Sequence, residues 1–188
     1  MNNSNHSNIL IIGGGCAGIS VATRLKSLKS DLSISIIEPS EKSLYQAAWT
    51  LVGAGAYDVN STIKPMSSVM PNYVNWIKEY AESFSPESNS VKTSSSEYSY
   101  DYLVVCPGLK INFDGVAGLK ETLGKNNVCT NYSADMAVYT WECLKNLNGG
   151  TLLFTEPPMP IKCAGAPQKI AYLAADHMKK KVLSKIVI

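Results

Sequence analysis

Two short segments of this 188-residue sequence hold residues whose types and spacing could carry out chemistry. The first, residues 160–169, places Cys163 beside Lys162 at the predicted start of a helix. A helix N-terminus carries partial positive charge and unpaired N–H groups, which favour the thiolate form of a cysteine, and the thiolate is the nucleophile. The segment therefore predicts a nucleophilic, redox-active thiol at Cys163. The alternative is a small buried apolar residue at a helix start.

The second segment is a glycine-rich loop that matches the pattern G-x-G-x-x-G. Its residues are Gly13, Gly14, Gly15, Cys16, Ala17 and Gly18. In this pattern Gly13 permits a tight turn, Gly15 lets the backbone approach a pyrophosphate, and Gly18 lets a helix pack closely on a strand. Glu38 follows Gly18 by 20 residues, where an acid accepts a hydrogen bond from a ribose 2′-hydroxyl and repels a 2′-phosphate. The loop therefore predicts binding of FAD or NAD rather than NADP.

The elements around this loop have the pattern of one strand–helix–strand unit. Residues 9–12 form an apolar run typical of a parallel strand buried on both faces. Apolar residues then recur at helical spacing as far as Leu28, and residues 33–37 form a second strand that ends at Glu38. The fold class that this predicts is α/β, with a Rossmann-like nucleotide-binding domain. The polar residues 1–8 are expected to form a frayed tail.

A second strand-and-turn pattern favours FAD over NAD. Residues 100–105 are strand-like and lead into Cys106, Pro107 and Gly108. This segment is similar to the one that closes the FAD-binding domain in flavoproteins with two dinucleotide-binding domains, so Pro107 and Gly108 are predicted to contact the cofactor. The alternative is a strand followed by an ordinary turn.

The remaining residues predict a two-domain organisation. Residues 1–128 are expected to form the FAD-binding domain, with a small β-meander inserted at about 70–100, and residues 129–188 a partial second domain of the NAD type. Within these ranges we expect a linker at 119–127, a helix at 135–147 capped by Ser133, a strand at 151–155 and a helix at 167–180. The last residues, 184–188, are expected to enter another strand. The apolar side of the 135–147 helix is predicted to consist of Met136, Tyr139, Trp141 and Leu144.

Composition excludes several classes of function. The net charge of +2 favours neither nucleic acid nor an acidic partner, and 45% hydrophobic residues suffice for a packed core. No apolar run reaches the roughly 18 residues of a membrane span. The five cysteines show no C-x-x-C spacing, so neither a disulfide scaffold nor a metal site is predicted.

Three segments together closely resemble the sulfide:quinone oxidoreductases, and the eukaryotic branch in particular. They are the glycine loop, residues 45–55 (Tyr-Gln-Ala-Ala-Trp-Thr-Leu-Val-Gly-Ala-Gly) and residues 162–169 (Lys-Cys-Ala-Gly-Ala-Pro-Gln-Lys). The resemblance runs from about Asn8 to Ile188, and it departs from the family at Ala47, where a proline is usual.

The resemblance implies a set of roles for these residues. Cys163 would be the flavin-proximal redox cysteine that passes two electrons to FAD, and Gln46, Cys16 and Ala17 would join the cofactor-binding residues. Hydrogen sulfide would be the substrate, a quinone the electron acceptor, and a small thiol or other sulfur acceptor the recipient of the sulfur. Eukaryotic members work at the mitochondrial inner membrane on the matrix side, although residues 1–8 are not a recognisable transit peptide.

Cys129 is a candidate second thiol. It precedes Cys163 by 34 residues, near the position where bacterial members of the family carry an additional cysteine, and a packed thiol is the alternative. The remaining cysteines, Cys16, Cys106 and Cys143, are expected to pack rather than react.

The resemblance also leaves alternatives to catalysis open. In the family, the second redox cysteine, the quinone pocket and the helices for peripheral membrane association lie in a C-terminal half that this sequence lacks. One alternative is therefore a truncated, non-catalytic FAD-binding fragment. Another is an NAD(P)H-dependent flavin dehydrogenase, which Pro157, Pro158 and Pro160 at the second nucleotide crevice disfavour.

Overall fold

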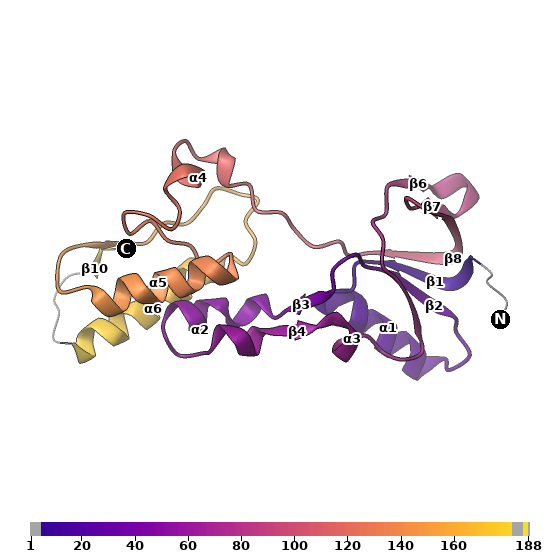
Figure 1. Cartoon of the computed structure of the whole chain (residues 1–188), viewed down its shortest axis with the longest axis horizontal. Helices are drawn as coiled ribbons and strands as arrows, with labels where there is room; N and C mark the ends of the chain where they lie inside the picture. Colours follow the sequence, from indigo (N-terminus) through magenta and orange to yellow (C-terminus); the bar gives the residue numbers. More distant parts are fainter. Residues whose placement is uncertain (1–4, 182–185, 188) are drawn as a thin grey trace. The chain divides into compact units, whose positions relative to one another are not determined.

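A computed structural model describes residues 5–181 and 186–187 of the chain (Figure 1). They form two compact units, one from Met1–Leu44 and Lys64–Gly108, the other from Tyr45–Ile63 and Leu109–Ile188. The chain leaves the first unit after Leu44 and returns to it at Lys64, so the units interleave in sequence. The predicted division into domains at 1–128 and 129–188 stays a prediction, because the division into compact units does not show where a functional domain begins or ends.

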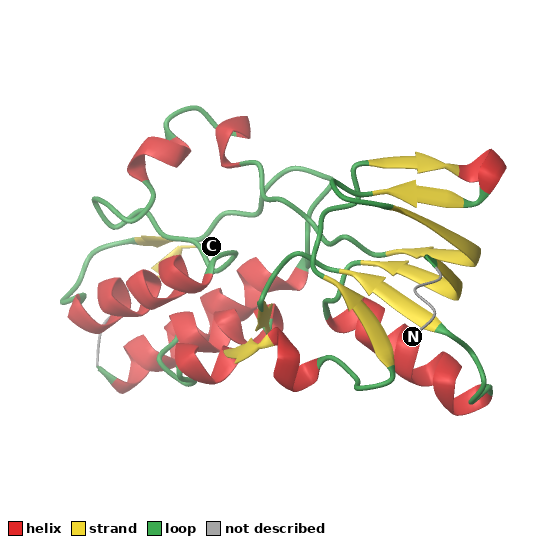
Figure 2. Ribbon diagram, turned by 45° about the vertical axis from the view of Figure 1, so that its right-hand side comes forward, coloured by secondary structure: helices red, strands yellow, loops and turns green. Residues whose placement is uncertain are grey.

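The first unit is built on a six-stranded sheet in the order β5-β2-β1-β8-β7-β6. Its strands are β1 (His6–Ile12), β2 (Ile34–Ile37), β5 (Val74–Ile77), β6 (Ser83–Ser85), β7 (Ser90–Lys92) and β8 (Glu97–Val105). The strands β5, β2, β1 and β8 are mutually parallel, and α1 (Cys16–Leu28) connects β1 to β2. Figure 2 shows α1 running along one face of this sheet. The predicted Rossmann-like α/β fold is confirmed.

The central strands are buried on both faces, which explains their continuous apolar runs. Every residue of β2 is buried, as are the last four residues of β1. The core on the α1 side consists of Ile9, Ile11, Ala22, Ile34 and Ile36. The core on the other face consists of Leu10, Ile12, Ile37, Ile77, Val91 and Tyr100.

The short strands between residues 70 and 100 divide between two roles. Residues 74–77, expected to belong to a separate meander, instead form β5, a parallel neighbour of β2. β6, β7 and β8 are consecutive antiparallel strands, and they extend the same sheet rather than forming a second one. Backbone pairing with β2 and β8 decides this arrangement, and the local alternation of side chains does not reveal it.

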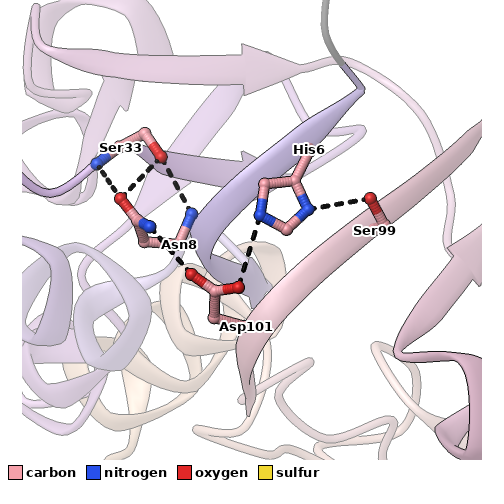
Figure 3. Close-up of polar contacts among 5 residues, drawn as sticks. All are labelled: His6, Asn8, Ser33, Ser99 and Asp101. Carbon is pink, nitrogen blue, oxygen red and sulfur yellow. Dashed lines mark hydrogen bonds and ion pairs between the residues drawn. The ribbon is translucent and has the colours of Figure 1, made fainter.

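A polar cluster joins three strands near the beginning of β1 (Figure 3). The side chain of Asn8 donates to Asp101 over 2.8 Å and accepts from both the N–H and the hydroxyl of Ser33. His6 Nε2 lies 3.4 Å from Asp101 Oδ1, and His6 Nδ1 lies 2.9 Å from Ser99 Oγ. The expectation of a frayed tail through residue 8 is therefore wrong for residues 6–8, whose polar side chains are held by β2 and β8. Residues 1–4 lie outside the described part of the chain.

The second unit consists of helices and short segments. Its longer helices are α2 (Trp49–Gly53), α5 (Ala134–Asn146) and α6 (Gly165–Lys180). Shorter elements are η1 (Gln46–Ala48), η2 (Val59–Thr62), η4 (Phe113–Gly115) and α4 (Leu119–Thr122). The strands β9 (Leu152–Leu153) and β10 (Ile186–Val187) pair in parallel. In the first unit, β3 (Lys42–Leu44), α3 (Met66–Val69) and η3 (Pro86–Ser88) complete the list, and β4 (Ile63–Pro65) pairs with β3.

The predicted helices of the second unit form with small shifts in their ends. α5 begins directly after Ser133, which holds the N-cap position although its side chain makes no capping hydrogen bond. The buried residues of α5 are Ala137, Thr140 and Leu144. Leu144 and Trp141 pack in one apolar cluster as predicted, whereas Met136 and Tyr139 are only partly buried. The expected linker at 119–127 contains α4, and the expected strand at 151–155 shortens to the two residues of β9. The strand expected at 184–188 is seen as β10, and residues 184, 185 and 188 lie outside the described part.

Two glycines of residues 45–55 lie close to neighbouring side chains within the second unit. A Cβ atom on Gly53 would overlap Oδ1 of Asn131, and one on Gly55 would overlap the indole ring of Trp141. Trp49, in the same segment, is buried against Val52 and Ala137. These glycines therefore let α2 approach α5 and residue 131 closely. Among the described residues, no helix is both long enough and apolar enough to cross a membrane.

Candidate functional site: a dinucleotide loop and an exposed thiol

The glycine loop follows β1 directly, and its three pattern glycines have different surroundings. Gly13 has a φ of +100°, and a Cβ atom there would overlap the carbonyl oxygen of Cys106. A Cβ atom on Gly18 would overlap the carbonyl oxygen of Gly13, so Gly18 lets α1 pack onto the loop. A Cβ atom on Gly15 would meet nothing within 4 Å. Gly13 and Gly18 are thus required by the protein itself, whereas the space beside Gly15 is open to a ligand.

Glu38 reaches the loop from the end of β2. Its Oε2 atom accepts a hydrogen bond from the N–H of Gly14 over 2.8 Å, and Oε1 accepts from the N–H of Ser40 over 2.7 Å. Its backbone carbonyl accepts from Trp76 Nε1 over 2.8 Å. A Cβ atom on Gly14 would lie 2.7 Å from Cγ of Glu38, so only glycine leaves room for the carboxylate. The spacing of Glu38 from the glycine loop predicted a site at this loop, but no sequence pattern indicated the contacts of Gly14 and Trp76 with Glu38.

The turn after β8 lies at the same edge of the sheet as the loop. Val105 pairs with Ile12, and the N–H of Cys106 donates to the carbonyl of Ile12 over 2.8 Å. A Cβ atom on Gly13 would lie 3.2 Å from Cα of Pro107. Because the ends of parallel strands meet at one edge, Pro107 and Gly108 lie beside the glycine loop, and both are exposed.

This edge fits the adenosine diphosphate part of a dinucleotide. Cys16 and Ala17 are exposed in the first turn of α1, and that turn contains no acidic residue. The N–H groups at a helix N-terminus bind phosphate groups, and an acid at the end of the second strand binds ribose. The residues that would hold FAD in this unit are therefore Gly13, Gly15, Cys16, Ala17, Gly18, Glu38, Pro107 and Gly108.

Cys163 lies in the second unit, two residues before α6. Its backbone has a φ of +54°, its side chain is exposed, and its carbonyl accepts from the N–H of Ala166 over 2.9 Å. The hydroxyl of Tyr132 also donates to this carbonyl, over 3.4 Å. Nζ of Lys169 lies 3.7 Å from Sγ of Cys163. The backbone of Cys163 is thus held from two sides, while its sulfur faces solvent and an ammonium group.

A second ammonium group lies beside this cysteine. Nζ of Lys162 lies 5.8 Å from the ring centre of Trp49 and 5.8 Å from that of Tyr132, within the range of cation–π contacts. Partial burial lowers the pKa of Lys162, and the charge that Cys163 can carry opposes this shift. Burial raises the pKa of Tyr132, and Cys163 and Glu156 raise it further. Lys169 and Trp49 belong to the segments that carry the family resemblance, but no sequence pattern indicated their contacts with Cys163 and Lys162.

Cys129 is also in the second unit, in a different environment. Its thiol donates to the carbonyl of Asn127 over 3.4 Å, and burial together with Cys143 raises its pKa to about 12. The thiol is therefore protonated at neutral pH, which favours the packed alternative over a nucleophilic role. Burial likewise raises the pKa of Cys106. Gln46 lies exposed in η1 of the second unit.

The fold and the glycine loop define a dinucleotide-binding α/β module of the flavoprotein type. The model of the family described as "Pyridine nucleotide-disulphide oxidoreductase" matches residues 7–137, and the chain belongs to this family. The family and its sulfide:quinone oxidoreductase members are flavoproteins that bind FAD.

Within this family the chain is similar to sulfide:quinone oxidoreductases. It is 45% identical over 179 residues to the mitochondrial sulfide:quinone oxidoreductase of Dictyostelium discoideum, covering 94% of this chain and 40% of that protein. It is 40% identical over 177 residues to the mitochondrial enzyme of Mus musculus, covering 94% of this chain and 39% of that protein. The solved structure of the Aquifex aeolicus enzyme matches 94% of this chain and 40% of its own, with 28% identity and a TM-score of 0.71. The chain thus spans about 40% of the length of the relatives it matches.

Proposed function

We propose that this chain contributes the FAD-binding region and one redox cysteine of a sulfide:quinone oxidoreductase, which oxidises hydrogen sulfide and passes the electrons to a quinone. The observation that carries the proposal is the placement of Cys163. It is an exposed thiol beside a lysine ammonium group, in a chain 40–45% identical to enzymes of that name.

The residues of the first unit would bind and orient the cofactor. Gly15 leaves space for a pyrophosphate, the first turn of α1 offers N–H groups to it, and Glu38 offers a carboxylate to the ribose. When bound, FAD supplies an acceptor for two electrons. The surroundings of the three glycines support this assignment. Packing within the protein accounts for glycine at positions 13 and 18, whereas no protein atom requires glycine at position 15.

The residues of the second unit would handle the sulfur. The carbonyl of Cys163 accepts hydrogen bonds from Tyr132 and Ala166, so the backbone of this residue has a defined position ahead of α6. Once its proton has passed to the solvent, to which Cys163 is exposed, this sulfur can attack as a thiolate the sulfane sulfur of a polysulfide or persulfide. The S–S bond of that donor breaks, a new S–S bond turns Cys163 into a persulfide, and the rest of the donor leaves as a thiolate or hydrosulfide. A small thiol or another sulfur acceptor would then remove the sulfur.

Two alternatives have different support. A non-catalytic FAD-binding chain would hold FAD with the same residues of the first unit, without a reaction at Cys163. An NAD(P)H-dependent flavin dehydrogenase is less well supported, because residues 151–164 contain no glycine that could bring the backbone close to a second pyrophosphate. The names of the relatives support a mitochondrial location, and we place the enzyme at the matrix side of the inner membrane as part of this proposal.

The test is the absorbance spectrum of the purified chain before and after anaerobic addition of sulfide. The proposal expects flavin bands that bleach with sulfide, and a Cys163→Ser variant that keeps the flavin but does not bleach. Cys129→Ser is the matched control, and we expect it to bleach like the unmodified chain. Bound flavin that sulfide leaves oxidised would favour the non-catalytic alternative, and bleaching by NADH alone would favour the dehydrogenase.

A further inference from the structure

Two lysine side chains are directed to the surroundings of Cys163. The stem of Lys169 runs back along the first turn of α6, with its Cε atom 3.6 Å from the position of a Cβ atom on Gly165, and its Nζ atom lies 3.7 Å from Sγ. Lys162, the neighbour of Cys163 in sequence, is held beside the rings of Trp49 and Tyr132. The two positive charges thus belong to side chains with specific contacts.

Lys169 directs its positive charge to the N-terminal end of α6, where a helix stabilises anions rather than cations. The N-terminus of a helix is its positive end, and cations are stabilised at the opposite end. The first turn of α6 contains no acidic residue that would offset the ammonium group. Glu156 raises the pKa of Tyr132. The arrangement therefore concentrates positive charge around one exposed sulfur atom.

We propose that Lys169 is a positioning residue that favours anionic reagents, such as hydrosulfide, over neutral ones at the sulfur of Cys163. The inference rests on the proposed function, since it assigns how the substrate would reach the reactive thiol. Lys162 adds a second positive charge near Cys163, and Nζ of Lys169 is the one that lies 3.7 Å from Sγ.

Alkylation with two probes of different charge tests this role. Iodoacetate carries a negative charge and iodoacetamide is neutral, yet both form one sulfur–carbon bond, release iodide and leave the thiol proton to the buffer. The ratio of their rates at the same cysteine cancels the fraction of thiolate and the exposure of the sulfur. Peptide mass spectrometry reports each cysteine separately, so Cys16, which is also exposed, serves as a reference within the same molecule.

We expect Lys169→Gln to lower the iodoacetate-to-iodoacetamide ratio at Cys163 about fivefold at low salt, the factor that one unit charge at about 4 Å produces in water. Lys169→Arg should keep the ratio, because it keeps the charge. The matched control is Lys179→Gln, which removes an exposed lysine of the same helix about 15 Å further along its axis. In the unmodified chain, raising the salt concentration to about 1 M should reduce the ratio at Cys163, because salt screens the ammonium charge.

Three results would overturn the inference. They are an unchanged ratio at Cys163 in a Lys169→Gln chain with the unmodified circular dichroism spectrum, an equal fall in Lys179→Gln, and an equal fall at Cys16. If Lys169→Gln does not fold, two measurements still test the inference. A ratio at Cys163 that does not fall with salt in the unmodified chain, or that is lost in Lys169→Arg, would overturn it. The assay uses neither FAD nor sulfide, so a ratio that depends on Lys169 in a chain that sulfide does not bleach would refute the proposed function and leave this inference intact.

Discussion

Alanine at two glycines of the same loop should separate binding of the cofactor from stability of the fold. A Cβ atom on Gly15 meets nothing within 4 Å, and Gly15 has an extended backbone (φ −74°, ψ −170°) that alanine also adopts. A Cβ atom on Gly18 would overlap the carbonyl oxygen of Gly13 at the junction of β1 and α1. The two substitutions add the same methyl group three residues apart, with opposite structural consequences.

The magnitudes follow from these surroundings. Gly15→Ala should change the free energy of unfolding of the apoprotein by less than about 1 kcal/mol, the usual range for a change at an N-cap position with free space. It should weaken FAD binding at least about tenfold, or about 1.4 kcal/mol, because the methyl group fills the approach to the pyrophosphate. Gly18→Ala should destabilise the apoprotein by about 1–3 kcal/mol through overpacking, which lowers the Tm by about 2–12 °C in a chain of this length.

Thermal unfolding of the apoprotein by circular dichroism and titration with FAD followed by flavin fluorescence measure the two effects. We expect the Gly15→Ala protein to be as stable as the unmodified chain but to bind FAD weakly. It would be refuted if Gly15→Ala bound FAD with unchanged affinity, or if it lowered the Tm as much as Gly18→Ala. Equal loss of both properties in both variants would mean that Gly15 is also a packing residue.

Two further predictions concern the polar cluster of the first unit and the buried thiol of the second. Asn8→Ala removes hydrogen bonds to Ser33 and Asp101 and should lower the free energy of unfolding by about 1–3 kcal/mol in urea titrations, whereas an unchanged midpoint would show that the cluster contributes nothing to stability. Because the folded protein raises the pKa of Cys129 from 9.0 to about 12, this thiol contributes stability that is fully present below pH 9 and is lost as the pH rises toward 12. Cys129→Ala should therefore lose less stability than the unmodified chain between pH 9 and pH 11, and parallel pH profiles of the two proteins would contradict the burial of this thiol.

Local patterns in the sequence were sufficient for the nucleotide-binding unit. The apolar run before Gly13, the glycine spacing and the acid 20 residues after Gly18 each follow from the physical demands of one strand–helix–strand unit. All of these residues lie within about 30 positions of one another, so their arrangement depends on local backbone geometry. The structure places Glu38 in contact with the loop, and its role as the ribose acceptor stays a prediction.

Long-range pairing decided what the local patterns missed. The polar residues 6–8 have no strand-like apolar pattern. Residues 6 and 7 pair with Ser99 and Tyr100 of β8, and Asn8 forms hydrogen bonds with Ser33 and Asp101. Residues 74–77 alternate like a meander strand, but β2 recruits them into the parallel sheet. The residues that pair with residues 6–8, and the strand β2 that pairs with residues 74–77, are distant in sequence. A short segment of the sequence therefore does not show that these residues form strands of the parallel sheet.

The environment of the thiols shows the same division. The sequence by itself determined that Cys163 precedes a helix and that Cys129 belongs to the second half of the chain. Only the tertiary structure decided that Cys163 is exposed beside Lys169, whereas Cys129 is held as a thiol with a raised pKa. The reactivity of a sulfur atom depends on burial and on charges within a few ångströms, and those are set by side chains that meet only after the chain has folded.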